Sequence, residues 1–433
     1  MAQQAHPRRH APRPSPHRPR RSRRRTRAHR HRRRRHATQP PPRRLPRRRR
    51  PHRRRRRDNH TDRLRLSLPR LRQRGHLMDA RLWHQQATAP PGTMPTPIPV
   101  ETFDAMSEAA QDEYWDEITT AMTGIVLPSV LAQRAAHHLT RLVDRNRLRP
   151  PGAKAIGSVS ASFAVGKSTF VKDWAQAAYR DLLGPACADP RPTWNPEPGV
   201  TADWIPQLYL TLRAASKIRD VLAALLLTMG YPSEGLVRVT TTRVIHAFRQ
   251  HGVRLLLIDD SHFLDVSNKD SRDMLDFLKY LNTELGELGG TMILVGADLH
   301  ESPLYLDPQI NSRLERLTLT AYPLATDDDR RTWQRFLKDA ETVLLPYFDC
   351  APAGIFSRQH AGYIWRRTQG YVGDTALLLT EALLAAFDDG SDTITTAHLD
   401  AVPLSARAIA GEAELRAVAP QPSRRRRVRV AVS

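Results

Sequence analysis

A nine-residue run limits the fold of this chain more than any other feature. It consists of Ala161, Ser162, Phe163, Ala164, Val165, Gly166, Lys167, Ser168 and Thr169. The hydrophobic segment Ala153–Ser160 before it predicts a strand, and the pattern over Gly166–Leu183 predicts a helix. A Gly-Lys-Ser turn between a strand and a helix is typical of a phosphate-binding loop, in which backbone N–H groups and the helix N-terminus face phosphate.

This motif assigns roles to two side chains. Lys167 would reach the β- and γ-phosphates of a nucleotide, and the hydroxyl of Ser168 would be a ligand of Mg²⁺. Ala161 stands where such loops usually have glycine, and its side chain restricts φ. A chance Gly-Lys-Ser sequence at a strand-to-helix turn is the alternative interpretation.

A second motif follows about 90 residues later, where the hydrophobic residues Leu255–Ile258 end in Asp259 and Asp260. A carboxylate at the end of a buried strand is costly unless a cation neutralises it, and Mg²⁺ bound to a nucleotide is the obvious cation. Asp259 is predicted to hold the water shell of the metal, and Asp260 to orient or deprotonate the attacking water. The alternative is an acidic turn in which Asp260 or Ser261 caps a helix. Together the two motifs predict an ATP- or GTP-binding fold.

The remaining pattern alternates between strands and helices. Strands are predicted at Ala153–Ser160, Ile205–Leu212, Val253–Ile258, Thr291–Val295 and Leu317–Tyr322, and helices at Gly166–Leu183, Ile218–Met229, Arg238–Gln250 and Arg272–Leu285. This order predicts an α/β fold of the P-loop NTPase kind, a parallel sheet flanked by helices, and the all-helical pattern from Asp327 predicts a smaller C-terminal lid. The predicted organisation is a disordered tail (1–96), a helical segment (97–150), a nucleotide-binding domain (151–325), a helical lid (326–405) and a flexible basic tail (406–433).

The positive charge of the chain lies at its ends. Residues 1–90 contain 32 arginines and three acids, and residues 421–433 add five arginines, whereas residues 91–420 carry a net charge of −10. Many DNA-binding domains are strongly basic, and the body of this chain is not. The N-terminal tail has two interpretations: a nucleic-acid-binding segment held by phosphate neutralisation, or GC-rich sequence translated upstream of a start at Met78, Met94 or Met106.

Cysteine content and hydropathy bound the cellular setting. Cys187 and Cys350 are too few for a disulfide framework or a four-cysteine zinc site, and they suit a reducing compartment. No apolar run approaches the roughly 18 residues of a membrane span, and no apolar segment of a secretory signal follows the basic N-terminus. We expect a cytoplasmic protein without membrane contact.

Four stretches resemble a known family. They are the acid-ended strand continuing through Ser261-His262-Phe263-Leu264, the helix Met274–Leu285, the strand Thr291–Gly296 with the arginine-bearing turn Asn311–Arg316, and the Thr-Gln-Gly turn of Arg367–Leu379. These stretches resemble AAA+ ATPases, and within that class the TniB/TnsC-type ATPases that regulate bacterial DNA transposition. The resemblance spans roughly residues 125–405.

The resemblance implies an ATP-binding protein that forms a homo-oligomer with ATP and binds duplex DNA without sequence preference. It further implies recruitment or activation of a transposase for target-site selection. Arg313 or Arg316 would act as an arginine finger on the γ-phosphate of a neighbouring subunit. The alternative for these arginines is a surface ion pair or an intrachain one with Glu315.

Some residues depart from the family pattern. Asp260 stands where the family usually has glutamate, so weak ATP hydrolysis, or binding without hydrolysis, is expected. The polar sensor position falls at Asp298, and Ala376 stands where many AAA+ proteins have a sensor arginine. A different class of function, a signalling or defence NTPase that switches without binding DNA, is the alternative, and a nucleotide-binding scaffold without activity is a third hypothesis.

Overall fold

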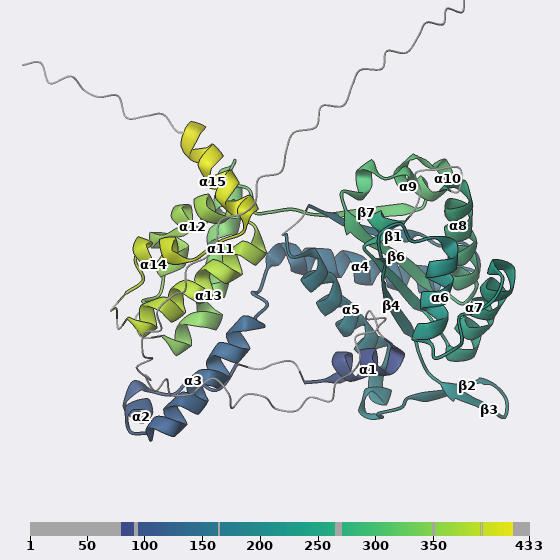
Figure 1. Ribbon diagram of the computed structural model, residues 1–433, viewed down its shortest axis with the longest axis horizontal. Coiled ribbons are helices and arrows are strands. Elements are labelled where there is room, and N and C mark those ends of the chain that lie inside the picture. The colour runs from purple at the N-terminus through teal and green to yellow at the C-terminus, as the bar shows by residue number, and fades with distance from the viewer. Residues whose placement is uncertain are drawn as a thin grey trace, which may run out of the picture. The chain divides into compact units, whose positions relative to one another are not determined.

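The computed structural model describes residues 79–90, 94–162, 165–264, 271–348, 351–389, 391 and 393–418. Its centre is a parallel sheet of five strands in the order β4-β5-β6-β1-β7 (Figure 1). The strands are β1 (Ile156–Ala161), β4 (Gln207–Thr211), β5 (Leu255–Asp259), β6 (Thr291–Ala297) and β7 (Leu314–Leu319). The nearly unbroken hydrophobic runs of β5 and β6 fit strands that are covered on both faces.

Helices cover the two faces of this sheet. One core contains apolar side chains of α6 (Ile218–Thr228), α7 (Val237–His251) and α8 (Ser271–Glu287). The other contains side chains of α1 (Ala80–Thr88), α4 (Val130–Leu148) and α5 (Lys167–Leu183). The short helices α9 (Pro303–Leu306) and α10 (Pro308–Asn311) precede β7. The α/β fold with a parallel sheet between helices is confirmed.

Two features of this domain differ from the sequence-based expectation. Strand β7 begins three residues before the predicted Leu317, because Leu314 is already paired with Ile156 of β1. β7 is an edge strand with half-exposed residues, so its apolar pattern was a poor guide to its ends. A hairpin of β2 (Thr193–Glu197) and β3 (Val200–Asp203) was not predicted, because its strands are mostly polar and exposed.

Residues 80–88 were assigned to a disordered tail, and that prediction is wrong. They form α1, which begins after Asp79, whose carboxylate accepts hydrogen bonds from the backbone N–H groups of Arg81 and Leu82. Trp83 and Ala87 are buried against the sheet domain. The arginine-rich composition before Met78 hid this short amphipathic helix.

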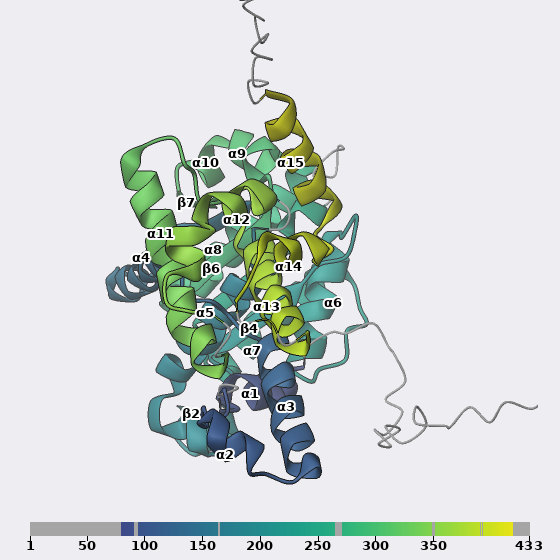
Figure 2. The same cartoon turned by 90° about the vertical axis from the view of Figure 1, so that its left-hand side faces the viewer.

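The C-terminal helices pack as a separate bundle. It contains α11 (Asp327–Leu344), α12 (Ala361–Thr368), α13 (Val372–Asp388), α14 (Thr396–Ala401) and α15 (Ala406–Val418), and α11, α12 and α13 lie side by side in Figures 1 and 2. Two N-terminal helices, α2 (Val100–Asp104) and α3 (Glu108–Thr123), precede α4. Ile118 and Met122 of α3 belong to the core of this bundle, and Val130 and Leu131 at the start of α4 pack against it. Leu139, further along α4, belongs to the core of the sheet domain. The predicted N-terminal helical segment therefore contributes to two cores.

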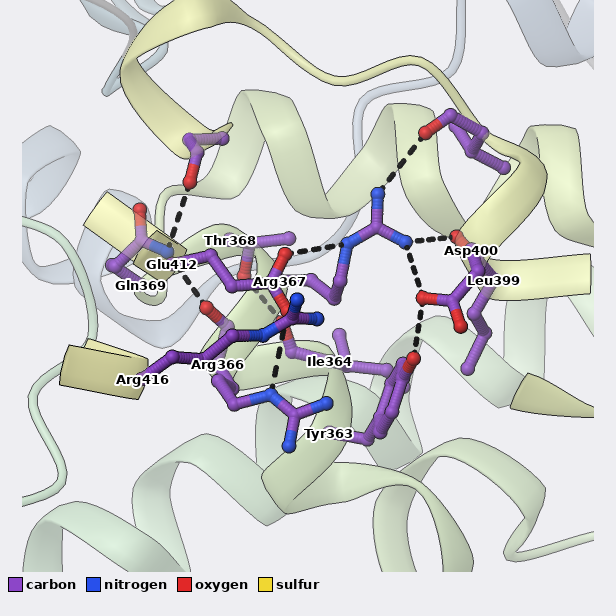
Figure 3. A network of polar contacts seen from close by, with 12 residues as sticks. Tyr363, Ile364, Arg366, Arg367, Thr368, Gln369, Leu399, Asp400, Glu412 and Arg416 are labelled. Carbon is purple, nitrogen blue, oxygen red and sulfur yellow. Dashed lines mark hydrogen bonds and ion pairs between the residues drawn. The ribbon is translucent and has the colours of Figure 1, made fainter. Parts of the chain in front are cut away.

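The helix α15 corrects the predicted flexible tail, which was placed from residue 406. Figure 3 shows how it is held: Glu412 of α15 pairs with Arg366 and Arg367 of α12 and with Arg416. Arg367, only 7% exposed, also donates to the backbone carbonyl of Val402 at 3.1 Å. A buried guanidinium needs such partners, and α15 supplies one of them.

None of the helices in the described part of the chain combines the length and apolar character needed to cross a membrane.

The Thr-Gln-Gly turn between α12 and α13 generates a stability prediction. Gly370 has φ +74°, and a Cβ there would lie 2.2 Å from the carbonyl oxygen of Tyr322. Gly370→Ala is therefore expected to destabilise the protein by about 2 kcal/mol or more, from the strained φ and the backbone clash. Thermal unfolding measures the effect.

Gly362 of α12 is the matched control, since a Cβ there meets no atom within 4 Å. Gly362→Ala should be neutral or stabilising by up to about 1 kcal/mol, because alanine favours a helix over glycine. Equal melting temperatures for Gly370→Ala and the wild type would contradict the steric argument.

Candidate functional site

The phosphate-loop residues lie between β1 and α5, as the motif requires. Gly166 adopts φ +90° at the N-cap of α5, a left-handed conformation that favours glycine. Val165 is buried, whereas Ser168 and Thr169 are exposed on the first turn of α5, and Ser162 is exposed at the end of β1. Ala161 is the last residue of β1, and Phe163 and Ala164 lie outside the described residues.

Lys167 connects the two sequence motifs. Its Nζ lies 3.3 Å from Oδ1 of Asp259 and 3.4 Å from Oδ1 of Asp260. The side chains of Lys167 and Asp259 are only 12% and 6% exposed, so this ion pair is shielded from water. The carboxyl ends of parallel strands lie at the same edge of the sheet. At this edge the ammonium of Lys167 lies beside the carboxylates of Asp259 and Asp260.

The carboxylate of Asp259 has further partners. Its Oδ1 accepts the backbone N–H of Asp260 at 2.8 Å, and its Oδ2 accepts the phenol of Tyr209 on β4 at 2.6 Å. Burial raises the pKa of Tyr209, and the adjacent charge of Asp259 raises it further, so the phenol remains a donor at neutral pH. Sequence reasoning missed Tyr209; the available signal was a hydroxyl-bearing aromatic within an otherwise apolar strand.

Asp260 occupies an unusual backbone position. Its φ is +54°, in the left-handed region that aspartate tolerates better than most residues. Its side chain is 31% exposed, and it makes no capping hydrogen bond to the short turn that follows. Ser261 donates instead to the carbonyl of Val295 at 2.8 Å. The helix-capping alternative for these two residues is therefore not what the structure has.

A pocket of about 700 Å³ adjoins Gly166. Its walls come from the end of α3 and the start of α4, the first turns of α5, the exposed side of β7 and the start of α13. Ile125, Leu127, Ala376 and Leu377 provide apolar surface, and Thr320 provides a hydroxyl. The apolar walls beside a phosphate loop suit a nucleotide base. Ala376 lies in this wall, so α13 offers a methyl group at the position expected for a sensor arginine.

The two candidate finger arginines differ in their surroundings. The guanidinium of Arg316 lies 4.6 Å from the ring centre of Tyr305 and contacts the side-chain oxygen of Asn311. Within the described residues, the side chain of Arg313 has no hydrogen-bond or ion-pair partner. Neither arginine pairs with Glu315, whose carboxylate contacts Arg145 and lies 3.8 Å from His138.

The carboxylate of Asp259 and the hydroxyl of Ser168 are hard oxygen donors of the type that Mg²⁺ prefers. Ser168 follows Lys167 in the sequence and is accessible to solvent, and Asp259 lies beside Lys167 in space. These residues therefore fit a magnesium ion that binds together with nucleotide phosphates.

The strand order, the glycine-lysine turn after β1 and the paired acids after β5 define a P-loop NTPase of the AAA+ class. Residues 130–324 match the model of the family described as "Bacterial TniB protein". The matched residues lie mostly in the α/β domain, and the match supports the resemblance of the sequence to TniB-type ATPases.

Three solved structures are similar to parts of this chain. The ORC2 protein of Aeropyrum pernix, solved as ADPNP-ADP complexes, is 16% identical with a TM-score of 0.46 over 66% of this chain and 70% of that chain. Cdc6p of Pyrobaculum aerophilum is 15% identical, with a TM-score of 0.43 over 62% and 66%. The RuvB Holliday junction branch migration motor of Thermotoga maritima is 15% identical, with a TM-score of 0.34 over 62% and 66%. No curated protein matches the chain.

The position of Lys167 generates a binding prediction. Lys167→Ala should weaken ATP binding by about 100-fold or more, because hydrogen bonds to charged groups each contribute about 1.5–3 kcal/mol. The protein should still fold, since Lys167 lies at a loop–helix junction outside the apolar core, but with lower stability, because the buried Asp259 loses its cation. Titration of a fluorescent ATP analogue, with circular dichroism as the folding check, measures both expectations.

Lys172 is the control, because it is an exposed lysine on the same helix one turn further on. Lys172→Ala should bind ATP as the wild type does. Unchanged ATP affinity in Lys167→Ala would show that the loop does not bind the phosphates.

Proposed function

We propose that this protein is an ATP-dependent assembly switch. It binds Mg²⁺–ATP at the loop of residues 161–169, oligomerises in that state, binds duplex DNA without sequence preference, and recruits or activates a transposase. The observation that carries the nucleotide part is the convergence of Lys167, Asp259 and Asp260 at one edge of the sheet. The DNA and transposase parts rest on the resemblance to TniB-type ATPases.

In this proposal each residue of the edge has one role. Lys167 leaves the acids and pairs with the β- and γ-phosphates, while Ser168 and Asp259 hold the magnesium ion. The metal, when bound, neutralises charge on the phosphates. Asp260 orients the attacking water, and its side chain is one methylene shorter than glutamate. Because a misplacement of about 1 Å can cost about 100-fold in rate, we propose that hydrolysis is slow.

Oligomerisation would complete the site in trans. We assign the finger role to Arg313 over Arg316, because Arg316 is held by Tyr305 and Asn311 whereas Arg313 has no partner among the described residues. An arginine that is free in one subunit is available to a phosphate bound by the next. This assignment makes subunit contact and ATP state interdependent.

Co-sedimentation with duplex DNA tests whether ATP binding at the loop promotes DNA binding. With the full chain, ATP should increase the amount of protein pelleted with long duplex DNA, and two unrelated DNA sequences should behave alike. Lys167→Ala should lose this ATP-dependent increment. The arginine-rich tail can contribute binding that does not depend on ATP, so the increment, and not total binding, is the informative quantity. ATP-dependent oligomers that are indifferent to DNA would favour the signalling NTPase alternative.

Mixing of variants tests the finger. Arg313→Ala subunits bind ATP but lack the arginine, and Lys167→Ala subunits keep the arginine but do not bind ATP. Each alone should hydrolyse ATP at or near background, and the mixture should regain part of the wild-type rate, because a finger acts on the nucleotide of its neighbour.

Arg316→Ala is the matched control for this experiment and should keep ATPase activity by itself. If mixing restores no activity to Arg313→Ala although that variant binds ATP normally, the finger assignment is wrong. Recovery with Arg316→Ala instead would transfer the role to Arg316.

A further inference from the structure

The two oxygens of the Asp259 carboxylate have different partners. Oδ1 faces Lys167 and the backbone N–H of Asp260, whereas Oδ2 accepts the 2.6 Å hydrogen bond from Tyr209. In the proposed function Lys167 moves to the phosphates and its contact with Oδ1 is lost. The bond from Tyr209 does not depend on that movement, because Tyr209 lies on β4, paired with β5 in the sheet.

Tyr209 is itself supported by α1. Its ring stacks on the indole of Trp83, with ring centres 5.0 Å apart and an angle of 18° between the planes. Trp83 is 2% exposed and Tyr209 is 6% exposed, so both rings are enclosed. An enclosed, stacked ring has few alternative rotamers, which fixes the direction of its hydroxyl.

The helix α1 is attached to the helix that begins with Lys167. Arg180 of α5 donates to the carbonyl oxygen of Ala87 at 2.7 Å, and His84 shares a 3.0 Å hydrogen bond with the hydroxyl of Tyr179. Figure 1 shows α1 beside α5. A helix outside the segment that matches the TniB family model therefore touches both α5 and the strand next to β5.

We propose that Tyr209 is a positioning residue for Asp259, and that α1 sets its orientation through Trp83. By holding Oδ2, the phenol keeps Oδ1 directed toward the phosphate loop after Lys167 has left. The docking of α1 thereby controls how well the site holds magnesium. The inference deepens the proposed function and rests on it.

Tyr209→Phe tests the inference, since it keeps the stacked ring and removes only the hydroxyl. Mg²⁺ is titrated into the full-length protein with a fluorescent ATP analogue, and the affinity for the analogue is also measured in EDTA. The variant should require about 10- to 100-fold more Mg²⁺, the usual effect of losing a partner of a metal ligand. Its affinity for the metal-free nucleotide should be unchanged, whereas a general loss of structure would weaken both.

Trp83→Leu is a second test that leaves Tyr209 in place, and it should raise the Mg²⁺ requirement in the same direction. Tyr347→Phe is the control, because it removes a hydroxyl that donates to the carbonyl of Pro95 at 2.8 Å in the helical bundle and touches neither α1 nor Asp259. It should keep the wild-type Mg²⁺ requirement. Wild-type Mg²⁺ dependence in both Tyr209→Phe and Trp83→Leu would overturn the inference, whereas a wild-type protein that binds no nucleotide would overturn the proposed function instead.

Discussion

The ion pairs of Lys167 with Asp259 and Asp260 are the interaction on which the rest of the site depends. A carboxylate at the end of a buried strand needs a cation, and in this structure the lysine of the phosphate loop supplies it. A bound nucleotide offers each partner a replacement: phosphate for Lys167 and magnesium for Asp259. Nucleotide binding in the proposed function is therefore an exchange of partners at one edge of the sheet, and the charges remain compensated throughout.

Segments that are far apart in the sequence lie near the phosphate loop or the strands beside it. Three elements that flank the family-matched segment in the sequence contact the sheet domain or the helical bundle. The helix α1 packs on α5 and β4, the end of α3 lines the pocket beside Gly166, and α13 closes the opposite wall of that pocket. The end of α3 and the start of α13 border the pocket directly, and α1 touches the helix that begins with Lys167. Such contacts suit a protein whose proposed task is to report its ATP state to partners.

The two arginines before β7 show how context separates residues that are alike in sequence. Arg316 lies over Tyr305 and contacts Asn311, so its charge is already used within the subunit. Arg313 precedes the strand and has no such partner in the described part of the chain. Glu315, which lies between them in the sequence, pairs with Arg145 on α4. Neither Arg313 nor Arg316 therefore forms the intrachain ion pair with Glu315 that was the alternative to the finger role.

The sequence by itself was sufficient for the α/β class, the parallel sheet and the motifs at its edge. Those features depend on local patterns: an unbroken hydrophobic strand, a Gly-Lys-Ser turn and acids at a strand end. The tertiary structure alone decided that Trp83 stacks on Tyr209, that Tyr209 holds Asp259, and that α4 contributes to two cores. These contacts join residues 50 or more positions apart, such as Tyr209 and Asp259. No periodicity within a single segment encodes such a pairing, because it arises only when the strands are placed side by side and the helices pack on them.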